Sequence, residues 1–183
     1  MLISANPHLA LAFANTRYWR GSAVPTDELS DASALLDWLE KNGMARPDGP
    51  QRATLVFDEA VALREVLYRV LAAQAQPGDI AALQAAIAAA PMRNRLGQTT
   101  DGFAWQLDDN AKSLPALLAP VLWSAGDLLT GDTARRLRLC SNDRCLYLFI
   151  DNSRSNARRW CDMKACGNRA KAHRHYLRSR VAE

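Results

Sequence analysis

Apolar residues recur at intervals of three and four positions through most of the first 130 residues, a spacing that places them on one face of an α-helix. The pattern predicts helices over about residues 6–19, 30–42, 57–76, 79–90 and 114–129. Residues that start or stop helices stand at several of the ends: Pro7 suits a first helical turn, Gly43 a helix end and Gly78 a break. The sequence therefore predicts a helical domain over residues 1–131.

Between residues 92 and 107 the spacing changes to the alternation of a β-strand. Residues 92–98 and 102–107 flank the dipeptide Asp101-Gly102, which is typical of a tight turn between antiparallel strands. We expect a β-hairpin with Phe103 and Trp105 on one face. Trp105 is expected to pack against the helices, and the lining of a pocket is the alternative.

The remaining residues, 132–183, form a second, smaller unit. The apolar run over residues 146–150 predicts a strand, and after a polar turn residues 157–161 are expected to return as a second strand paired with it. Asp162 is a suitable N-cap for a final helix that runs from Met163 to about residue 180. The fold class expected is mainly α with a small β-hairpin, in the α+β class.

The charge of the chain changes sign close to this boundary. The net charge of +4 is the sum of about −5 over residues 1–134 and +9 over residues 135–183. The basic charge therefore belongs to the C-terminal module. No apolar run approaches the roughly 20 residues that cross a bilayer, so no membrane contact is expected.

The C-terminal module also holds every cysteine of the chain. Cys140 and Cys145 form one C-x4-C pair, and Cys161 and Cys166 form a second pair after fifteen intervening residues. Two such pairs suit a single tetrahedral zinc ion with four thiolate ligands. With the predicted strands and helix, this arrangement indicates a treble-clef-like zinc module that holds one structural Zn²⁺. So short a module has little apolar surface to bury, and the metal would supply on the order of 10 kcal/mol of folding free energy.

Two other readings of the cysteines are open at this stage. Two disulfides would require an oxidising compartment, but Met1 is followed by no basic segment and only by short apolar runs, unlike a signal peptide. The sequence therefore predicts a cytoplasmic protein. The second reading is four unrelated buried thiols, and the clustering of all four within 27 residues argues against it.

Nothing in the sequence calls for catalysis. A zinc ion with four thiolate ligands has no open position for water. The helical part has a single histidine, His8, and contains no Gly-rich phosphate loop, H-E-x-x-H motif or G-x-S-x-G motif. We expect that the protein is not an enzyme.

Two segments resemble known families. The tetrapeptide Cys166-Gly167-Asn168-Arg169, after the spaced cysteines and the Trp160-Cys161 pair, resembles the CGNR zinc finger of bacterial proteins over about residues 135–180. Residues 13–17, Phe-Ala-Asn-Thr-Arg, resemble the opening motif of the ABATE domain that precedes this finger, and Leu36-x-x-Leu39 follows. The resemblance implies a transcription regulator of a stress-response family, with the finger proposed to bind DNA.

The final helix has one face toward the metal and a basic face opposite. The candidate contacts to nucleic acid lie on this face and on the preceding strand: Arg158, Arg159, Lys164, Asn168, Lys171, Arg174, His175 and Arg178. The alternatives are a solvated basic face or a face that docks on the acidic N-terminal half. Arg169 lies nearer the metal and is expected to fasten the zinc loop. His173 and His175 are not expected to be ligands, because four thiolates fill the zinc shell.

The function predicted is a zinc-dependent DNA-binding transcription regulator, in which the helical domain senses a signal or mediates assembly. The alternative is a redox- or zinc-responsive regulator whose basic finger docks an acidic protein. A homodimer is expected, because one small finger that reads one short site would bind weakly. A small-molecule effector pocket is predicted at Asn15, Arg17 and Trp105, although Asn15 and Arg17 could instead bond neighbouring loops.

Overall fold

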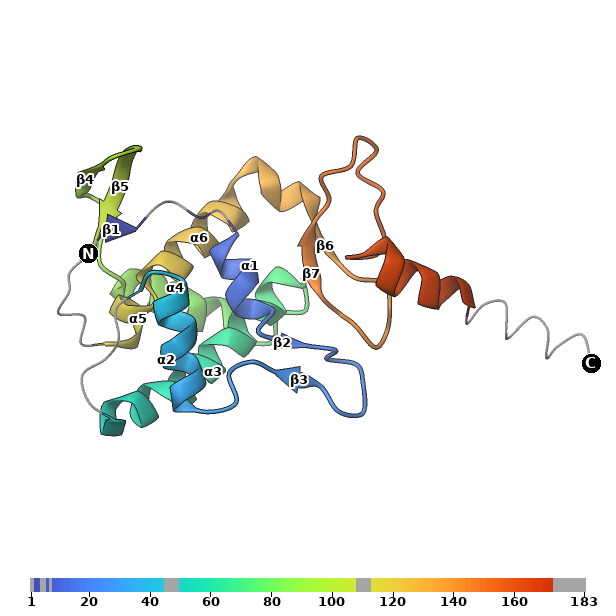
Figure 1. Ribbon diagram of the computed structural model, residues 1–183, viewed down its shortest axis with the longest axis horizontal. Helices are drawn as coiled ribbons and strands as arrows, with labels where there is room; N and C mark the ends of the chain where they lie inside the picture. The colour runs from blue at the N-terminus through green and yellow to red at the C-terminus, as the bar shows by residue number, and fades with distance from the viewer. Residues whose placement is uncertain (1, 4–5, 7, 45–49, 108–112, 173–183) are drawn as a thin grey trace, which may run out of the picture.

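The computed structural model describes residues 2–3, 6, 8–44, 50–107 and 113–172. It has a helical domain and a smaller C-terminal unit beside it (Figure 1). The helices are α1 (Leu9–Ala14), α2 (Ala32–Lys41), α3 (Pro50–Leu71), α4 (Asp79–Ala89), α5 (Leu114–Leu117) and α6 (Ala119–Thr130). Strands β1 (Leu2–Ile3), β5 (Gly102–Gln106) and β4 (Leu96–Thr99) form one small sheet, in that order. The predicted α+β class, mainly helical, is confirmed.

Helix α1 lies at the centre of the core, between α6 and α3. Five of its six residues are buried, since its short Leu-Ala-Leu-Ala-Phe-Ala sequence offers apolar atoms all round the axis. The ring of Phe13 is fully buried, 5.1 Å from the ring of Trp38 on α2. The hydroxyl of Ser124 on α6 accepts a hydrogen bond from the Ala10 N–H, which ties the first turn of α1 to its neighbour.

The boundaries of three helices differ from the prediction. Helix α1 ends at Ala14, and β2 (Arg17–Tyr18) pairs instead with β3 (Thr26–Asp27). Helix α3 begins at Pro50, seven residues before the predicted start, and ends at Leu71, five residues before the predicted end. The predicted helix over 114–129 is divided into α5 and α6 just before Pro120, which cannot donate a backbone hydrogen bond.

The predicted hairpin is confirmed as β4 and β5, with the Gly102 backbone at a φ of +137° in the turn. The short strand β1 adds to the hairpin and was not predicted, because two residues carry no periodicity. Trp105 packs against the main core, and the Arg93 guanidinium lies 5.3 Å from its ring centroid. Phe103, in contrast, is exposed.

In the C-terminal unit, the strand pairing differs from the prediction. Strand β7 (Leu148–Ile150) pairs with β6 (Leu137–Leu139), whereas residues 157–161 form no strand. The fully buried carboxylate of Asp151 explains the difference. It accepts hydrogen bonds from the backbone N–H groups of Ser153 and Arg158, and so holds the segment after β7 in a loop.

The C-terminal unit packs directly on the helical domain, as the short connection between them suggests. The side chain of Leu148 belongs to the main hydrophobic core. The Tyr68 hydroxyl on α3 donates to the Leu146 carbonyl at 2.7 Å, and the Gly21 N–H donates to the Arg144 carbonyl. A Cβ at Gly21 would meet the carbonyl oxygen of Asp143 at 1.7 Å, so only glycine fits this contact. Among the described residues, no helix has both the length and the apolar character needed to cross a membrane.

Candidate metal centre and its surroundings

The sulfur atoms of Cys140, Cys145, Cys161 and Cys166 lie within 4.8 Å of one another. The Cys145 and Cys161 sulfurs are 3.6 Å apart, and those of Cys161 and Cys166 are 3.7 Å apart. Four sulfurs about 2.3 Å from a central zinc ion stand about 3.8 Å apart at tetrahedral angles. A disulfide would need a separation of about 2.05 Å, and all four cysteines are free thiols. The donor set therefore fits one zinc ion.

Local backbone hydrogen bonds hold the two cysteine pairs in position. The Cys140 N–H donates to the Tyr147 carbonyl, and the Cys145 N–H donates to the Asn142 carbonyl, which closes the first turn. Cys166 lies in the π-helical turn η2 (Met163–Gly167) at the start of the final helix. The Asp162 carboxylate accepts a hydrogen bond from the Ala165 N–H, so the predicted N-cap is confirmed.

Contacts between the thiols shift their pKa values in opposite directions. A hydrogen bond from Cys161 lowers the pKa of Cys145 to about 6, and the same contact raises the pKa of Cys161. Burial raises the pKa of Cys166 to about 11. A dication allows all four sulfurs to ionise and to bind as thiolates.

Aromatic and arginine side chains surround the sulfurs. Arg158 donates to the carbonyls of Trp160 and Cys161, and its guanidinium lies 5.0 Å from the ring centroid of Phe149. It thereby holds the loop that carries Cys161. This fastening was expected of Arg169, whose guanidinium instead lies 4.8 Å from the ring centroid of Trp19, in the helical domain.

Trp19 itself packs against the cysteine cluster, as does Trp160. The helical domain therefore contributes one wall of the metal site. Its backbone has a positive φ of 55° at this position, an uncommon conformation for a tryptophan. The tight turn places the indole against the metal module.

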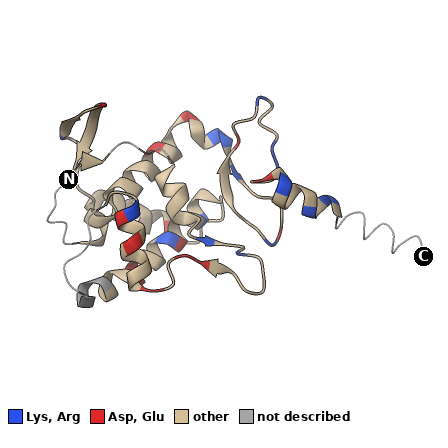
Figure 2. Ribbon diagram, viewed as in Figure 1, with Lys and Arg blue, Asp and Glu red and all other residues tan. Residues whose placement is uncertain are grey.

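The basic surface predicted around the final helix is present over part of its length. Arg159, Lys164, Asn168 and Lys171 are exposed, whereas Arg158 is half-buried and bound as described above. The other three predicted contacts, Arg174, His175 and Arg178, lie outside the described residues, as does His173. Basic positions follow the whole C-terminal unit, and acidic positions are concentrated in the helical domain (Figure 2). Five further arginines of the same unit, absent from the predicted set, are also exposed: Arg135, Arg136, Arg144, Arg154 and Arg169.

The three residues of the predicted effector pocket do not share one cavity. The Asn15 amide is buried and makes two hydrogen bonds with the backbone of Leu148, at 2.8 and 3.0 Å. Arg17 lies 3.9 Å from the Glu65 carboxylate. Trp105 lies on β5, in a different sheet from Arg17. Asn15 therefore has the loop-bonding role that was the alternative, although it also borders a hollow.

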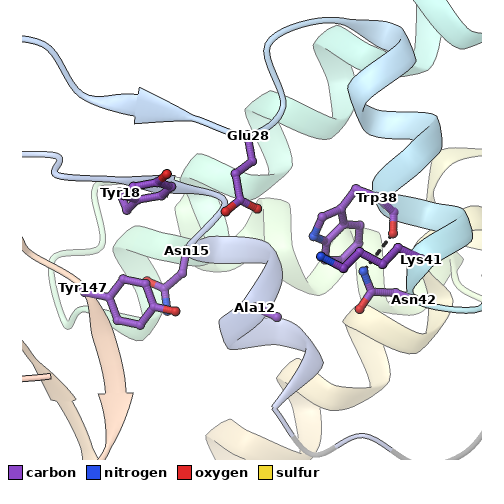
Figure 3. Close-up of a pocket in the computed structure, with 8 residues that line it drawn as sticks. All are labelled: Ala12, Asn15, Tyr18, Glu28, Trp38, Lys41, Asn42 and Tyr147. Carbon is purple, nitrogen blue, oxygen red and sulfur yellow. Dashed lines mark hydrogen bonds between the residues drawn. The ribbon is translucent and has the colours of Figure 1, made fainter. Parts of the chain in front are cut away.

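That hollow has a volume of about 410 Å³ and lies where the two units of the protein meet (Figure 3). Its walls come from α1, α2, the β2–β3 hairpin and the residue before β7: Ala12, Asn15, Tyr18, Glu28, Trp38, Lys41, Asn42 and Tyr147. Sequence reasoning identified only Asn15 among them. The others are too far apart along the chain to signal a shared cavity.

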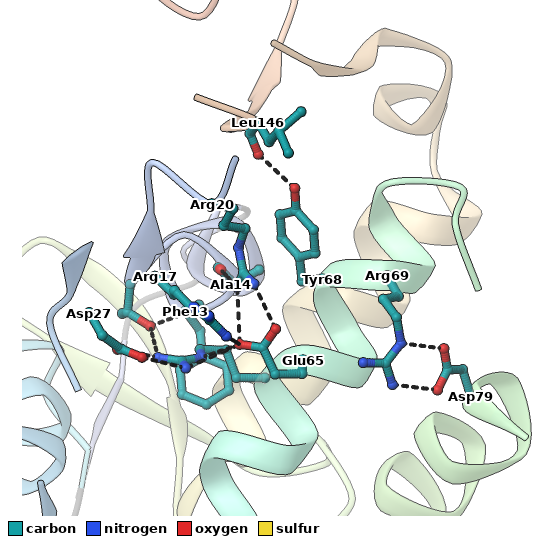
Figure 4. A network of polar contacts seen from close by, with 12 residues as sticks. Phe13, Ala14, Arg17, Arg20, Asp27, Glu65, Tyr68, Arg69, Asp79 and Leu146 are labelled. Carbon is teal, nitrogen blue, oxygen red and sulfur yellow. Dashed lines mark hydrogen bonds and ion pairs between the residues drawn. The ribbon is translucent and has the colours of Figure 1, made fainter. Parts of the chain in front are cut away.

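A network of arginines and carboxylates lies beneath the metal unit (Figure 4). Arg64 on α3 is 1% exposed and binds both carboxylate oxygens of Asp27, at 2.5 and 2.8 Å. Arg20 donates to Glu65 at 2.6 Å and lies 3.7 Å from the Tyr68 ring centroid. Burial raises the pKa of Glu65, but the hydrogen bond and charge of Arg20 outweigh it and leave that pKa below its ordinary value.

Sequence reasoning missed this network, although one signal was available. Arg64 falls on the apolar face of α3, four residues after Ala60 and three before Leu67, where a charged residue must have a buried partner.

A metal site closed by four cysteines, on a small unit with little core of its own, defines a zinc-finger protein. Two family models match the chain. The ABATE family, described as "Putative stress-induced transcription regulator", matches residues 7–132, and the CGNR zinc finger matches residues 136–179. The chain therefore belongs to the ABATE family, with a CGNR zinc finger after the ABATE domain, and it binds one structural zinc ion at its four cysteines. Neither family is one of enzymes. No curated protein matches the chain.

Proposed function

We propose that this protein is a zinc-dependent DNA-binding transcription regulator whose finger contacts the duplex. The observation that carries the proposal is the segregation of charge, about +9 over residues 135–183 against −5 over residues 1–134. A basic surface fixed by a metal supports phosphate binding, because its side chains are displayed on a rigid frame. The acidic helical domain would be repelled from DNA, so the finger determines the orientation of the complex.

The contacts proposed are on the outer face of the finger. Arg159, Lys164 and Lys171 are exposed, and among the described residues their side chains make no hydrogen bond or ion pair. The Arg159 guanidinium lies 5.3 Å from the ring centroid of Trp160. Asn168 lies between the two lysines along the helix, and an asparagine amide pairs well with the edge of adenine. We assign phosphate contacts to the three basic residues and a base contact to Asn168. Arg174, His175 and Arg178 would extend the same surface.

The helical domain is proposed to sense a signal or to mediate assembly. A dimer would place two fingers on one DNA site and raise the affinity of each. Light scattering of the zinc-loaded protein, with and without DNA, tests this part: a monomer under both conditions would contradict it.

The test of DNA binding is a titration of a labelled duplex with the zinc-loaded protein across a series of salt concentrations. We expect affinity to fall steeply with salt, because each phosphate contact releases counterions. A triple variant, Arg159→Ala with Lys164→Ala and Lys171→Ala, should retain zinc but lose up to about 3 units of the slope of log K against log salt.

Arg95→Ala provides the matched control, since Arg95 is an exposed arginine of the helical domain. The control should bind as the wild type does. The proposal fails if the wild type shows no binding at low salt, or if the triple variant binds as tightly as the control.

A second candidate is a redox-responsive regulator whose basic finger docks an acidic protein. It is supported by the partial exposure of Cys161, whereas the other three cysteines are buried. An oxidant that reaches Cys161 would convert its thiolate to a sulfenate and weaken zinc binding. Zinc release on peroxide treatment, together with absence of DNA binding, would favour this function over the first.

A further inference from the structure

The hollow between the two units has features that the metal site and the basic surface do not use. Its volume of about 410 Å³ lies within the range of small-molecule sites, roughly 300–1,000 Å³. Aromatic side chains form much of its wall, from Tyr18, Trp38 and Tyr147. Such walls take up the flat or apolar part of a ligand.

Two opposite charges face this hollow without partners. Glu28 and Lys41 both line it and are solvent-exposed, and neither side chain has a hydrogen-bond or ion-pair partner within the described part of the chain. They form no ion pair with each other and come from different elements, Glu28 from the segment after β3 and Lys41 from the end of α2. In Figure 3, the Glu28 carboxylate lies between Tyr18 and Trp38, and Lys41 lies beside Trp38 and Asn42. A ligand with a positive group at one end and a negative group at the other would satisfy both charges.

The surrounding structure holds the backbone from which the two charged side chains extend. The Glu28 N–H donates to the Thr16 carbonyl at 2.8 Å, and its neighbour Asp27 is clamped by the buried Arg64. Lys41 is the last residue of α2, where the Asn42 amide donates to the Trp38 carbonyl at 2.8 Å. A backbone that is already fixed at both positions loses less entropy on binding than a flexible one.

We propose that this hollow is a binding site for a small zwitterion of the α-amino-acid type, with its ammonium on Glu28, its carboxylate on Lys41 and an apolar side chain against the aromatic walls. The site is built from both units of the protein. Tyr18 precedes Trp19, which covers the cysteine cluster, and the Tyr147 carbonyl accepts the Cys140 N–H. A ligand between the two tyrosines therefore binds the helical domain and the finger together.

This arrangement gives the ligand a regulatory effect, and that part rests on the proposed function of the finger. A molecule that binds only the docked arrangement stabilises it by mass action. By linkage, the ligand and the zinc ion reinforce each other's binding. The ligand would thus fix the orientation of the basic surface relative to the helical domain.

The test is isothermal titration calorimetry of the full-length, zinc-loaded protein with each of the common L-amino acids, without DNA. We expect binding by at least one apolar member of the set, for which L-phenylalanine is the reference probe. Phenethylamine lacks the carboxylate and hydrocinnamate lacks the ammonium, so each should bind about tenfold more weakly than L-phenylalanine or worse.

Glu28→Gln and Lys41→Gln should each weaken the binding of the amino acid about tenfold. Each variant should also lose affinity for the one analogue that carries the group it binds. Specifically, Glu28→Gln should leave hydrocinnamate binding unchanged, and Lys41→Gln should leave phenethylamine binding unchanged. Glu59→Gln, at an exposed position of α3 outside the hollow, is the matched control and should bind as the wild type does. The bound amino acid should also slow the transfer of zinc to a chelator.

The proposal is overturned if no common L-amino acid binds, or if the two pocket variants bind as the control does. Because the calorimetry contains no DNA, its outcome is independent of the proposed function. A protein that binds the amino acid but no duplex would overturn the DNA-binding function and leave the site standing. A protein that binds the duplex but no amino acid would overturn the proposed ligand site and leave the DNA-binding function standing.

Discussion

The helical domain and the zinc finger are stabilised by different means. The helical domain has a continuous core in which α1 is buried on nearly every side. The finger has a small cluster of its own, formed by three buried cysteines and Phe149, with Trp19 of the helical domain against it. Burial of apolar surface folds the first unit. The second depends on a metal ion and on a neighbour that supplies the rest of its core.

The largest effect should come from removal of a metal ligand. Cys166→Ser leaves three thiolates and is expected to abolish stoichiometric zinc binding, which contributes on the order of 10 kcal/mol to the folding of such modules. The finger should lose its structure while α1, α3 and α6 remain folded. Metal analysis and hydrogen exchange measure the two parts separately. Ser155→Ala, at an exposed serine of the same unit, is the control. If the finger and the helical domain lost protection from hydrogen exchange equally, the two units would not be stabilised by different means.

A smaller but still substantial effect should follow from Asn15→Ala. The Asn15 amide satisfies both the N–H and the carbonyl of Leu148 in a buried place, and its loss leaves both groups without a partner. We expect the free energy of unfolding to fall by about 2–4 kcal/mol, measured by urea denaturation. Asn6→Ala removes an exposed local hydrogen bond to His8 and should cost less than about 1 kcal/mol. Equal losses would show that the contact between the units contributes little.

The close approach of the two units can be tested with a pair of glycine substitutions. Gly21→Ala places a methyl group against the Asp143 carbonyl and should destabilise the protein by about 1–3 kcal/mol through forced separation of the contact. Gly126→Ala, within α6, adds a methyl group in open space and should stabilise the helix by up to about 1 kcal/mol. Melting temperatures of the two variants should therefore move in opposite directions. If both melting temperatures moved in the same direction, the close approach of Gly21 to the Asp143 carbonyl would be contradicted.

The smallest effect is a dependence on pH confined to the helical domain. Hydrogen bonds from Arg69, and from the Gln76 N–H, lower the pKa of Asp79 from its ordinary 3.8 to about 2. Because the folded value is the lower one, the ionised carboxylate stabilises the fold above about pH 4 and loses this effect as the pH falls toward 2. The difference in melting temperature between wild type and Asp79→Asn should therefore shrink in that window. Asp58→Asn, at an exposed site, should show no such trend.

The parts that could be predicted from the sequence depend on local signals. The four cysteines, the Asp162 cap and the Asp101-Gly102 turn are each recognisable within a few residues, and each took the form expected. The helices were found for the same reason, since their periodicity repeats over several turns. Their ends were less certain, because a residue such as Asn15 can either extend a helix or bond to a distant strand.

The parts that could not be predicted depend on partners far apart in the chain. Strand β6 and the buried ion pair of Arg64 with Asp27 are set by tertiary contacts that no local window contains. The wrong strand over residues 157–161 has the same cause, because the Asp151 carboxylate overrides the β-propensity of the segment. The hollow, too, is formed by residues that come together only in the folded chain.

The place of Leu148 in the main core bears on how such fingers can be exchanged between proteins. A gene fusion that carried residues 136–172 onto an unrelated domain would bring the cysteines but not the surface that receives them. The recipient would need an amide at the site of Asn15, a glycine at the site of Gly21 and a hydroxyl at the site of Tyr68. The finger is therefore inherited together with the surface of the helical domain that receives it. Recombination that separates the finger from this surface should be selected against.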